Sequence, residues 1–143
     1  MSNKTKWILE LNDEQVILLR DITEFFARIT AGQTREICRI LEAFSPNSDS
    51  ADLSPESQTY IADIIKRTYF PELSENASYG AYSLELSRSS KIAWDLYQVL
   101  RKPLHDKFTP QHKMSVHGDE ATQSCSTCDL AIFKEGKIDS LKE

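Results

Sequence analysis

All three histidines and two of the three cysteines lie in one stretch of this 143-residue chain: His105, His112, His117, Cys125 and Cys128. Thiolates and imidazoles are the ligands of tetrahedral zinc sites, and Cys125-x-x-Cys128 would place two sulfurs on one turn. His117 with either His112 or His105 would complete the set, and we take His112 and His117 as the predicted ligands. The histidine spacing matches no standard zinc finger, and no second Cys-x-x-Cys pair is present. A zinc site, a redox-active or nucleophilic thiol and chemically ordinary side chains therefore all remain open.

A second candidate site is the serine-rich, basic segment 87–91, at the expected start of a helix. Helix N-termini present free backbone N–H groups and a partial positive charge, so they bind phosphates and carboxylates. An aromatic ring and a cation further along the same helix could stack on a nucleotide base. In the competing interpretation the serines only cap the helix and Trp94 packs in the core. The candidate ligand-binding residues of this segment are Arg88, Ser89, Ser90, Lys91, Trp94, Tyr97 and Arg101.

Two further candidates are Gln33 and Tyr79. Gln33 follows Gly32 and interrupts an otherwise apolar helical face, where an amide without hydrogen bonds costs roughly 1–3 kcal/mol. Either the helix breaks at residues 30–32, or Gln33 joins an internal hydrogen-bond network, or it marks the close approach of a ligand or partner helix. Tyr79 and Tyr82 flank Gly80 in a loop. Tyrosines there can line a pocket or close the core with their hydroxyls in water.

The elements that would position these residues are mostly helices. Asn12 with Gln15 has the pattern of a capping box, and Ser54 with Pro55 has that of a second helix start. Together with the apolar spacing, these caps predict three main helices, at about 13–44, 55–69 and 88–102, with Pro103 ending the last. Short apolar runs at 7–11, 113–117 and 130–133 predict strands that could pair into a small sheet from both ends of the chain. The predicted fold is therefore α+β, in a single domain covering residues 1–143.

The main apolar stripe of the first helix includes Val16, Leu19, Ile22, Phe26 and Ile29, and the helix carries Leu18 and Phe25 in addition. Apolar residues around much of a helix favour burial on two sides. Self-association would supply the second covering surface, and the other two helices could supply it equally well. The sequence therefore predicts either a homo-oligomer or a monomer in which the other helices cover these residues.

The composition narrows the function. A net charge of −5 argues against indiscriminate binding to nucleic acid, and we expect no sequence-specific nucleic-acid partner. No apolar run reaches the length of a membrane span, and three cysteines make no disulfide framework, so we expect a cytoplasmic protein. The chain contains no phosphate-binding glycine loop, no Gly-x-Ser-x-Gly and no His-Glu-x-x-His. Binding is therefore favoured over catalysis.

Four segments together resemble a group of small phage and prophage proteins of unassigned function. They are Leu9-Glu-Leu-Asn-Asp-Glu-Gln15, Ala27-Arg-Ile-Thr-Ala-Gly-Gln33, Asn76-Ala-Ser-Tyr-Gly80 and Ala93-Trp-Asp-Leu-Tyr-Gln-Val-Leu-Arg101. The resemblance covers roughly residues 9–104 and implies a bacterial host cytoplasm and an accessory role in infection, such as countering a host defence. It implies no activity and no catalytic residues.

The leading hypothesis is a phage-type accessory protein that binds a host protein or sequesters a small anionic, nucleotide-like ligand. We expect no obligatory cofactor. A structural zinc module is the alternative, and a small hydrolase or redox enzyme is the third interpretation.

Overall fold

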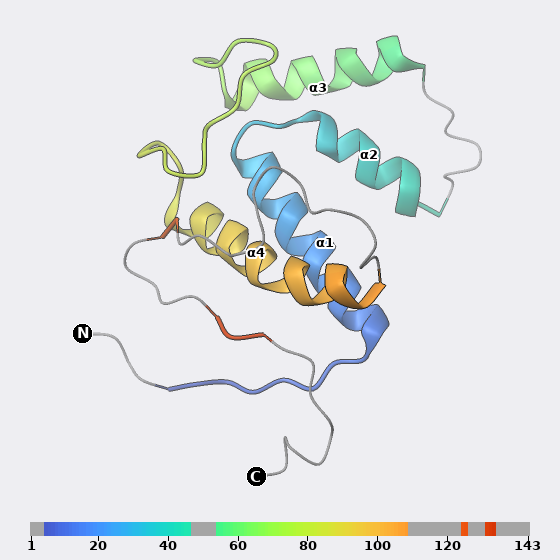
Figure 1. Cartoon of the computed structure of the whole chain (residues 1–143). Coiled ribbons are helices and arrows are strands. Elements are labelled where there is room, and N and C mark those ends of the chain that lie inside the picture. Colours follow the sequence, from blue (N-terminus) through green and yellow to red (C-terminus); the bar gives the residue numbers. More distant parts are fainter. Residues whose placement is uncertain (1–4, 47–53, 109–123, 126–130, 134–143) are drawn as a thin grey trace.

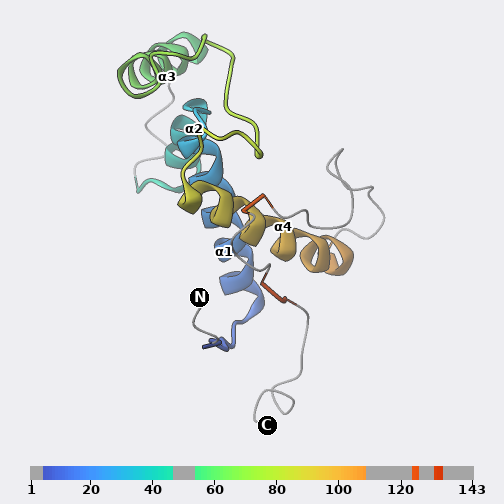
Figure 2. The ribbon, with the colours of Figure 1, turned by 90° about the vertical axis from the view of Figure 1, so that its left-hand side faces the viewer.

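The computed structural model describes residues 5–46, 54–108, 124–125 and 131–133. Within these residues the chain forms four helices: α1 (Asp13–Thr30), α2 (Arg35–Phe44), α3 (Pro55–Tyr69) and α4 (Arg88–Phe108). Helix α4 packs along α1, while α2 follows the end of α1 and pairs with α3 (Figure 1). In the view turned by 90°, α3 lies at the top, and α4 extends to the right, away from α2 and α3 (Figure 2). No helix in the described part of the chain is both long and apolar enough to cross a bilayer.

The predicted α+β fold is wrong, because the described residues form helices and contain no strand. Residues 7–11 run below α1 and α4 without pairing to a neighbouring strand, and Trp7, Ile8 and Leu9 are exposed (Figure 1). Residues 131–133 also form no strand, while 113–117 and 130 lie outside the described residues. Alternating apolar residues favour an extended backbone, but a strand also requires a hydrogen-bonding neighbour, which local sequence does not supply.

The first predicted helix, 13–44, is in fact two helices. Helix α1 begins at the predicted capping box, where the Asn12 and Gln15 side chains each accept from the other residue's backbone N–H at 2.9 Å. It ends in a Schellman motif, in which the Gly32 N–H donates to Ile29 O and the Gln33 N–H donates to Arg28 O. Gly32 has φ +99°, a conformation that glycine adopts without a Cβ penalty. The single helix predicted over 13–44 is therefore wrong, and of the three open alternatives the helix break at residues 30–32 is present.

Helices α1 and α4 build the apolar core, in which Val16, Leu100 and Leu104 are buried together. The buried face of α1 carries Val16, Thr23 and Ala27, so the predicted core stripe through Ile22 is wrong: Ile22 is exposed. Helix α4 also continues past its predicted end at 102, with Pro103 inside it. A proline within a helix removes one backbone donor, and here the following turn buries Leu104 against α1.

Helices α2 and α3 pair through small and polar side chains. The Thr34 hydroxyl donates to Ala62 O at 2.9 Å, and Cys38 Sγ lies 3.8 Å from Gln58 O. Helix α3 agrees with the prediction for 55–69, and its cap is confirmed: Ser54 Oγ accepts from the Ser57 N–H, with proline at the first helical position. The loop after α3 returns to the end of α1, where the Tyr79 N–H donates to Ala31 O at 2.8 Å.

Candidate functional site

A pocket of about 440 Å³ opens where the start of α2 meets α3 and the loop that follows α3. Small-molecule sites commonly have volumes of about 300–1,000 Å³. One wall is formed by residues 32–36 and another by 75–78. The third consists of Thr59, Ala62, Asp63 and Lys66, which lie at positions i, i+3, i+4 and i+7 and therefore share one face of α3. Three segments far apart in the sequence therefore form the site.

The start of α2 lines this pocket and contributes an arginine, Arg35. Thr34 occupies the N-cap position, but its hydroxyl donates to Ala62 O and does not accept from the α2 backbone. The N–H groups of Glu36 and Ile37 donate to Gln33 O and Thr34 O, both at 3.2 Å, while that of Arg35 is in no such bond. Since a helix N-terminus carries a partial positive charge, this wall favours an anionic group. The Arg35 guanidinium, 3.4 Å from Thr59 Oγ1, adds a full charge.

Lys66 brings a second positive charge to the pocket from α3. The residue is only 6% exposed, and its ammonium donates to Glu75 O at 3.1 Å and to Ala77 O. A buried ammonium must be hydrogen-bonded, and it has three N–H donors, of which these two carbonyls take two. Lys66 therefore fixes loop 75–77 against α3 and can still donate to a ligand.

Carboxylates balance these cations. Glu36 forms an ion pair with Arg39 at 2.6 Å, so its charge is largely compensated. Asp63 and Glu75 also line the pocket. With Arg35 and Lys66 opposed by Asp63 and Glu75, the walls suit a ligand with one anionic group and several hydrogen-bond donors. A polyphosphate would bring excess negative charge toward the carboxylates.

Gln33 lines this pocket, and its side-chain Oε1 accepts from Arg28 Nη1 at 3.0 Å. Arg28 also forms an ion pair with Glu24 at 2.9 Å. The helix break and the hydrogen-bond network are therefore both present, and the approach of a ligand to Gln33 stays a prediction. Tyr79 adjoins the pocket through Ser78, and its hydroxyl donates to the Glu72 carboxylate. That bond raises the pKa of Tyr79 to about 12.

The residues predicted to bind a ligand at the start of α4 differ in burial and in hydrogen bonding. Ser90 is buried: its Oγ lies 2.6 Å from Thr30 Oγ1 of α1 and 2.9 Å from Ser87 Oγ. The Ser87 hydroxyl accepts from the Ser90 N–H at 3.1 Å, which makes it a helix cap. Arg88 and Ser89 are exposed, and Lys91 is half-buried. The capping interpretation therefore applies to Ser87, while Ser90 holds α4 against α1.

The aromatic residues of α4 contact cations of the chain itself. The Trp94 and Tyr97 rings lie 5.2 Å apart. The Arg28 guanidinium lies 5.7 Å from the Trp94 ring centre, and that of Arg101, which is buried, lies 5.8 Å from the Tyr97 ring centre. Such contacts contribute roughly 0.5–2 kcal/mol each. The Arg28–Trp94 contact joins α1 to α4, whereas the Arg101–Tyr97 contact lies within α4. Ligand binding by Trp94, Tyr97 and Arg101 stays a prediction.

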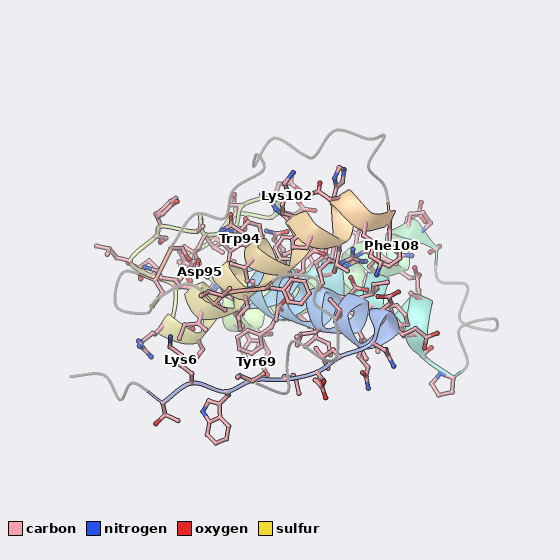
Figure 3. All side chains as sticks on the ribbon, turned by 60° about the horizontal axis from the view of Figure 1, so that its bottom comes forward. Lys6, Tyr69, Trp94, Asp95, Lys102 and Phe108 are labelled. Carbon is pink, nitrogen blue, oxygen red and sulfur yellow. The ribbon has the colours of Figure 1, made fainter. Side chains whose placement is uncertain are left out.

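One predicted zinc ligand, Cys125, is described and buried. Its N–H donates to Asp95 Oδ2 at 3.0 Å, while the Ser124 N–H and hydroxyl both donate to Asp95 Oδ1 at 2.8 Å. Asp95 is a buried α4 residue that stands beside Trp94 (Figure 3). His112, His117 and Cys128 lie outside the described residues, and the described part of the chain contains no cluster of three potential metal ligands. Zinc binding therefore stays a prediction.

No protein-family model, curated protein or solved structure matches this chain. The resemblance to phage proteins accordingly stays a prediction.

Sequence reasoning missed Thr34, Asp63, Lys66 and the 75–78 wall, and it also missed the carboxylate of Asp95. A usable signal existed on α3, where Thr59, Asp63 and Lys66 form a polar stripe opposite the apolar one. Nothing in the local sequence shows that α2 and the distant loop meet that stripe.

Proposed function

We propose that this protein binds a small ligand carrying one carboxylate or phosphate group in the pocket between α2 and α3. The observation that carries the proposal is the convergence of Lys66, Arg35 and the N-terminus of α2 on one pocket of about 440 Å³. An anion there would accept charge-assisted hydrogen bonds, which are about twice as strong as neutral ones. Hydroxyl or amino groups of the ligand would donate to Asp63 and Glu75. The protein acts by binding and not by catalysis.

The pocket is a better candidate than the start of α4. At α4, Ser90 is engaged in the contact between helices, and the rings that might stack on a base face cations of the chain. In the pocket, polar groups from three segments surround an open volume. Arg35 and Lys66 are therefore the proposed anion-binding residues, in place of Arg88 and Lys91.

The biological setting is a further part of the proposal. Sequestration of such a ligand in a bacterial cytoplasm during phage infection, as a counter to host defence, rests on the sequence resemblance alone. Cys38 is a buried thiol that forms no disulfide with any described residue, which agrees with a reducing compartment. A host protein as the bound partner remains the other form of the binding hypothesis.

The test is calorimetric titration of the full chain with inorganic phosphate, acetate, amino acids and nucleoside monophosphates. We expect at least one of these probes to bind. The Arg35→Ala variant should then bind it at least tenfold more weakly, because a charge-assisted hydrogen bond contributes about 1.5–3 kcal/mol. Arg35 is exposed, so its loss should leave folding intact.

The matched control is Arg88→Ala, which removes the same exposed side chain from the start of α4. It should leave the affinity unchanged. The opposite pattern, with Arg88→Ala weakening binding and Arg35→Ala having no effect, would place the ligand at α4. If the wild-type chain binds none of the probes, the ligand proposal fails.

A further inference from the structure

The pocket between α2 and α3 is lined by charges of both signs. Arg35 and Lys66 contribute positive charges, while Asp63 and Glu75 contribute an equal number of negative ones. Glu36, the remaining carboxylate of the lining, is already ion-paired with a residue outside it. Charges that leave water must be paired and hydrogen-bonded. A ligand with one charge of each sign would keep the filled pocket balanced, whereas a simple anion would leave one negative charge in excess.

Asp63 is a carboxylate of this pocket that lacks a partner. It is half-buried, and within the described part of the chain its side chain forms no ion pair and no hydrogen bond. Asp63 and Lys66 share a face of α3 one turn apart, at a spacing that puts about 5–6 Å between Cβ atoms. The Lys66 ammonium nevertheless donates to Glu75 O and Ala77 O. A negative and a positive group therefore lie side by side without being paired to each other.

The uncharged part of the lining is small and polar. It includes the hydroxyls of Thr59 and Ser78 and the amide of Asn76. Among the described residues that line the pocket there is no aromatic ring and no apolar side chain larger than that of alanine. Nucleobases bind largely by stacking on aromatic rings, and apolar ligands require apolar walls. The lining therefore favours a small polar ligand over a nucleotide or an apolar molecule.

Given the proposed function, on which this step rests, we infer that the pocket binds a free α-amino acid with a polar side chain. The ligand carboxylate accepts hydrogen bonds from the Arg35 guanidinium and from the third N–H of Lys66. The ligand ammonium donates to the carboxylates of Asp63 and Glu75. An α-amino acid carries its two charges on one carbon, so both can reach partners that are neighbours on a single helix face. Its side chain occupies the polar remainder of the pocket.

The first test compares amino acids with derivatives that lack one of the two charges. The standard amino acids are titrated singly into the full chain by calorimetry, and we expect at least one with a polar side chain to bind. Its deaminated acid keeps the carboxylate and lacks the ammonium, while its carboxamide keeps the ammonium and lacks the carboxylate. Each derivative should bind at least tenfold more weakly, because each loses hydrogen bonds between charged groups.

The Asp63→Asn variant assigns the ammonium site, because it removes the charge and keeps the size of the side chain. It should bind the amino acid at least tenfold more weakly and bind the deaminated acid as the wild type does. The matched control is Glu56→Gln, which neutralises an exposed carboxylate of α3 outside the pocket and should change neither affinity. Circular dichroism of both variants should show the helix content of the wild type.

The outcomes separate the ligand class from the proposed function. Binding of phosphate, acetate or a nucleoside monophosphate without binding of any amino acid would overturn the inference and leave the anion site standing. If none of these probes binds, both fail. A deaminated acid that binds as tightly as its parent, or an unchanged amino-acid affinity in Asp63→Asn, would also overturn the inference. A preference for leucine or phenylalanine over every polar amino acid would do the same.

Discussion

The pair α1–α4 and the pair α2–α3 are held together by different means. Helices α1 and α4 share an apolar core around Leu100 and Leu104, reinforced by the Ser90–Thr30 contact. Helices α2 and α3 meet through the small residues Thr34, Cys38 and Ala62 and leave a polar pocket beside them. Apolar burial is worth about 25 cal/mol per Å², so most of the stability of the described part should come from α1–α4.

The two helix pairs therefore have different roles, one in stability and the other in binding. A pocket with a buried ammonium and several carboxylates is a poor source of stability, because buried charges require hydrogen bonds merely to offset their desolvation. It can nevertheless bind a polar ligand. The structure therefore combines a stabilising α1–α4 half with a binding α2–α3 half, joined by the turn at Gly32.

The largest expected effect is in the α1–α4 core. Leu100 is 3% exposed, and Leu100→Ala should lower the free energy of unfolding by about 2–5 kcal/mol, through lost burial and the remaining cavity. The comparison variant Leu41→Ala lies on α2, where Leu41 is 58% exposed, and should cost under about 0.5 kcal/mol. Urea unfolding of both variants provides the measurement. Equal losses at the two positions would contradict the division between the two halves.

An intermediate effect is expected at the turn between the halves. In Gly32→Ala the alanine backbone would have to adopt φ +99°, and the new Cβ would lie 2.7 Å from Leu73 Cδ1. The left-handed backbone alone costs about 1–2 kcal/mol. Amide hydrogen exchange in α2 and α3 should therefore accelerate about tenfold, the factor that 1.4 kcal/mol produces. Exchange within α1 and α4 should change little.

Gly80→Ala is the control for this prediction. No atom lies within 4 Å of the added Cβ, and Gly80 has no positive φ. Its exchange pattern should match that of the wild type. If Gly32→Ala accelerates exchange equally in all four helices, the two helix pairs unfold as one unit. They would then differ in their packing but not in their stability.

The parts of the fold that could be predicted from sequence depend on neighbouring residues. The Asn12–Gln15 capping box, the Ser54 cap with Pro55 and the break at Gly32 all involve contacts within five residues. The sheet could not be predicted correctly, because strand formation depends on a partner elsewhere in the chain. The predicted end of the last helix at Pro103 is wrong for a similar reason. The burial of Leu104 against α1, which is distant in sequence, stabilises the helical turn that follows the proline.

The candidate site shows the same limit. Gln33 could be recognised from sequence because it interrupts an apolar helical face. Lys66 lies in a helix whose apolar and polar faces continue without interruption, so no break in the pattern marks it. The role of Lys66 in the pocket follows from its bonds to Glu75 O and Ala77 O, nine and eleven residues away. Local spacing can thus mark a polar residue, and only the tertiary contacts reveal which of these residues share a pocket.

The smallest expected effect concerns the loop beyond the pocket, where the Tyr79 hydroxyl donates to the Glu72 carboxylate. This bond holds the pKa of Glu72 below its usual 4.5 and is the main cause that raises the pKa of Tyr79 from 10 to about 12. A raised tyrosine pKa stabilises the folded loop below pH 10 and loses that effect as the pH rises through 12. The lowered Glu72 pKa acts above pH 4.5, and its contribution disappears as the pH falls through the folded value.

Both groups are accessible to water, so titration is a more sensitive readout of their bond than unfolding. In Glu72→Gln, the tyrosinate absorbance of one residue should shift from about pH 12 toward its ordinary value near 10. Subtracting the curve of Tyr79→Phe assigns that signal among the five tyrosines. An unchanged tyrosinate curve in Glu72→Gln would show that the loop is not held by this bond. The backbone bond from the Tyr79 N–H to Ala31 O, at the end of α1, would then be the contact that holds Tyr79 in place.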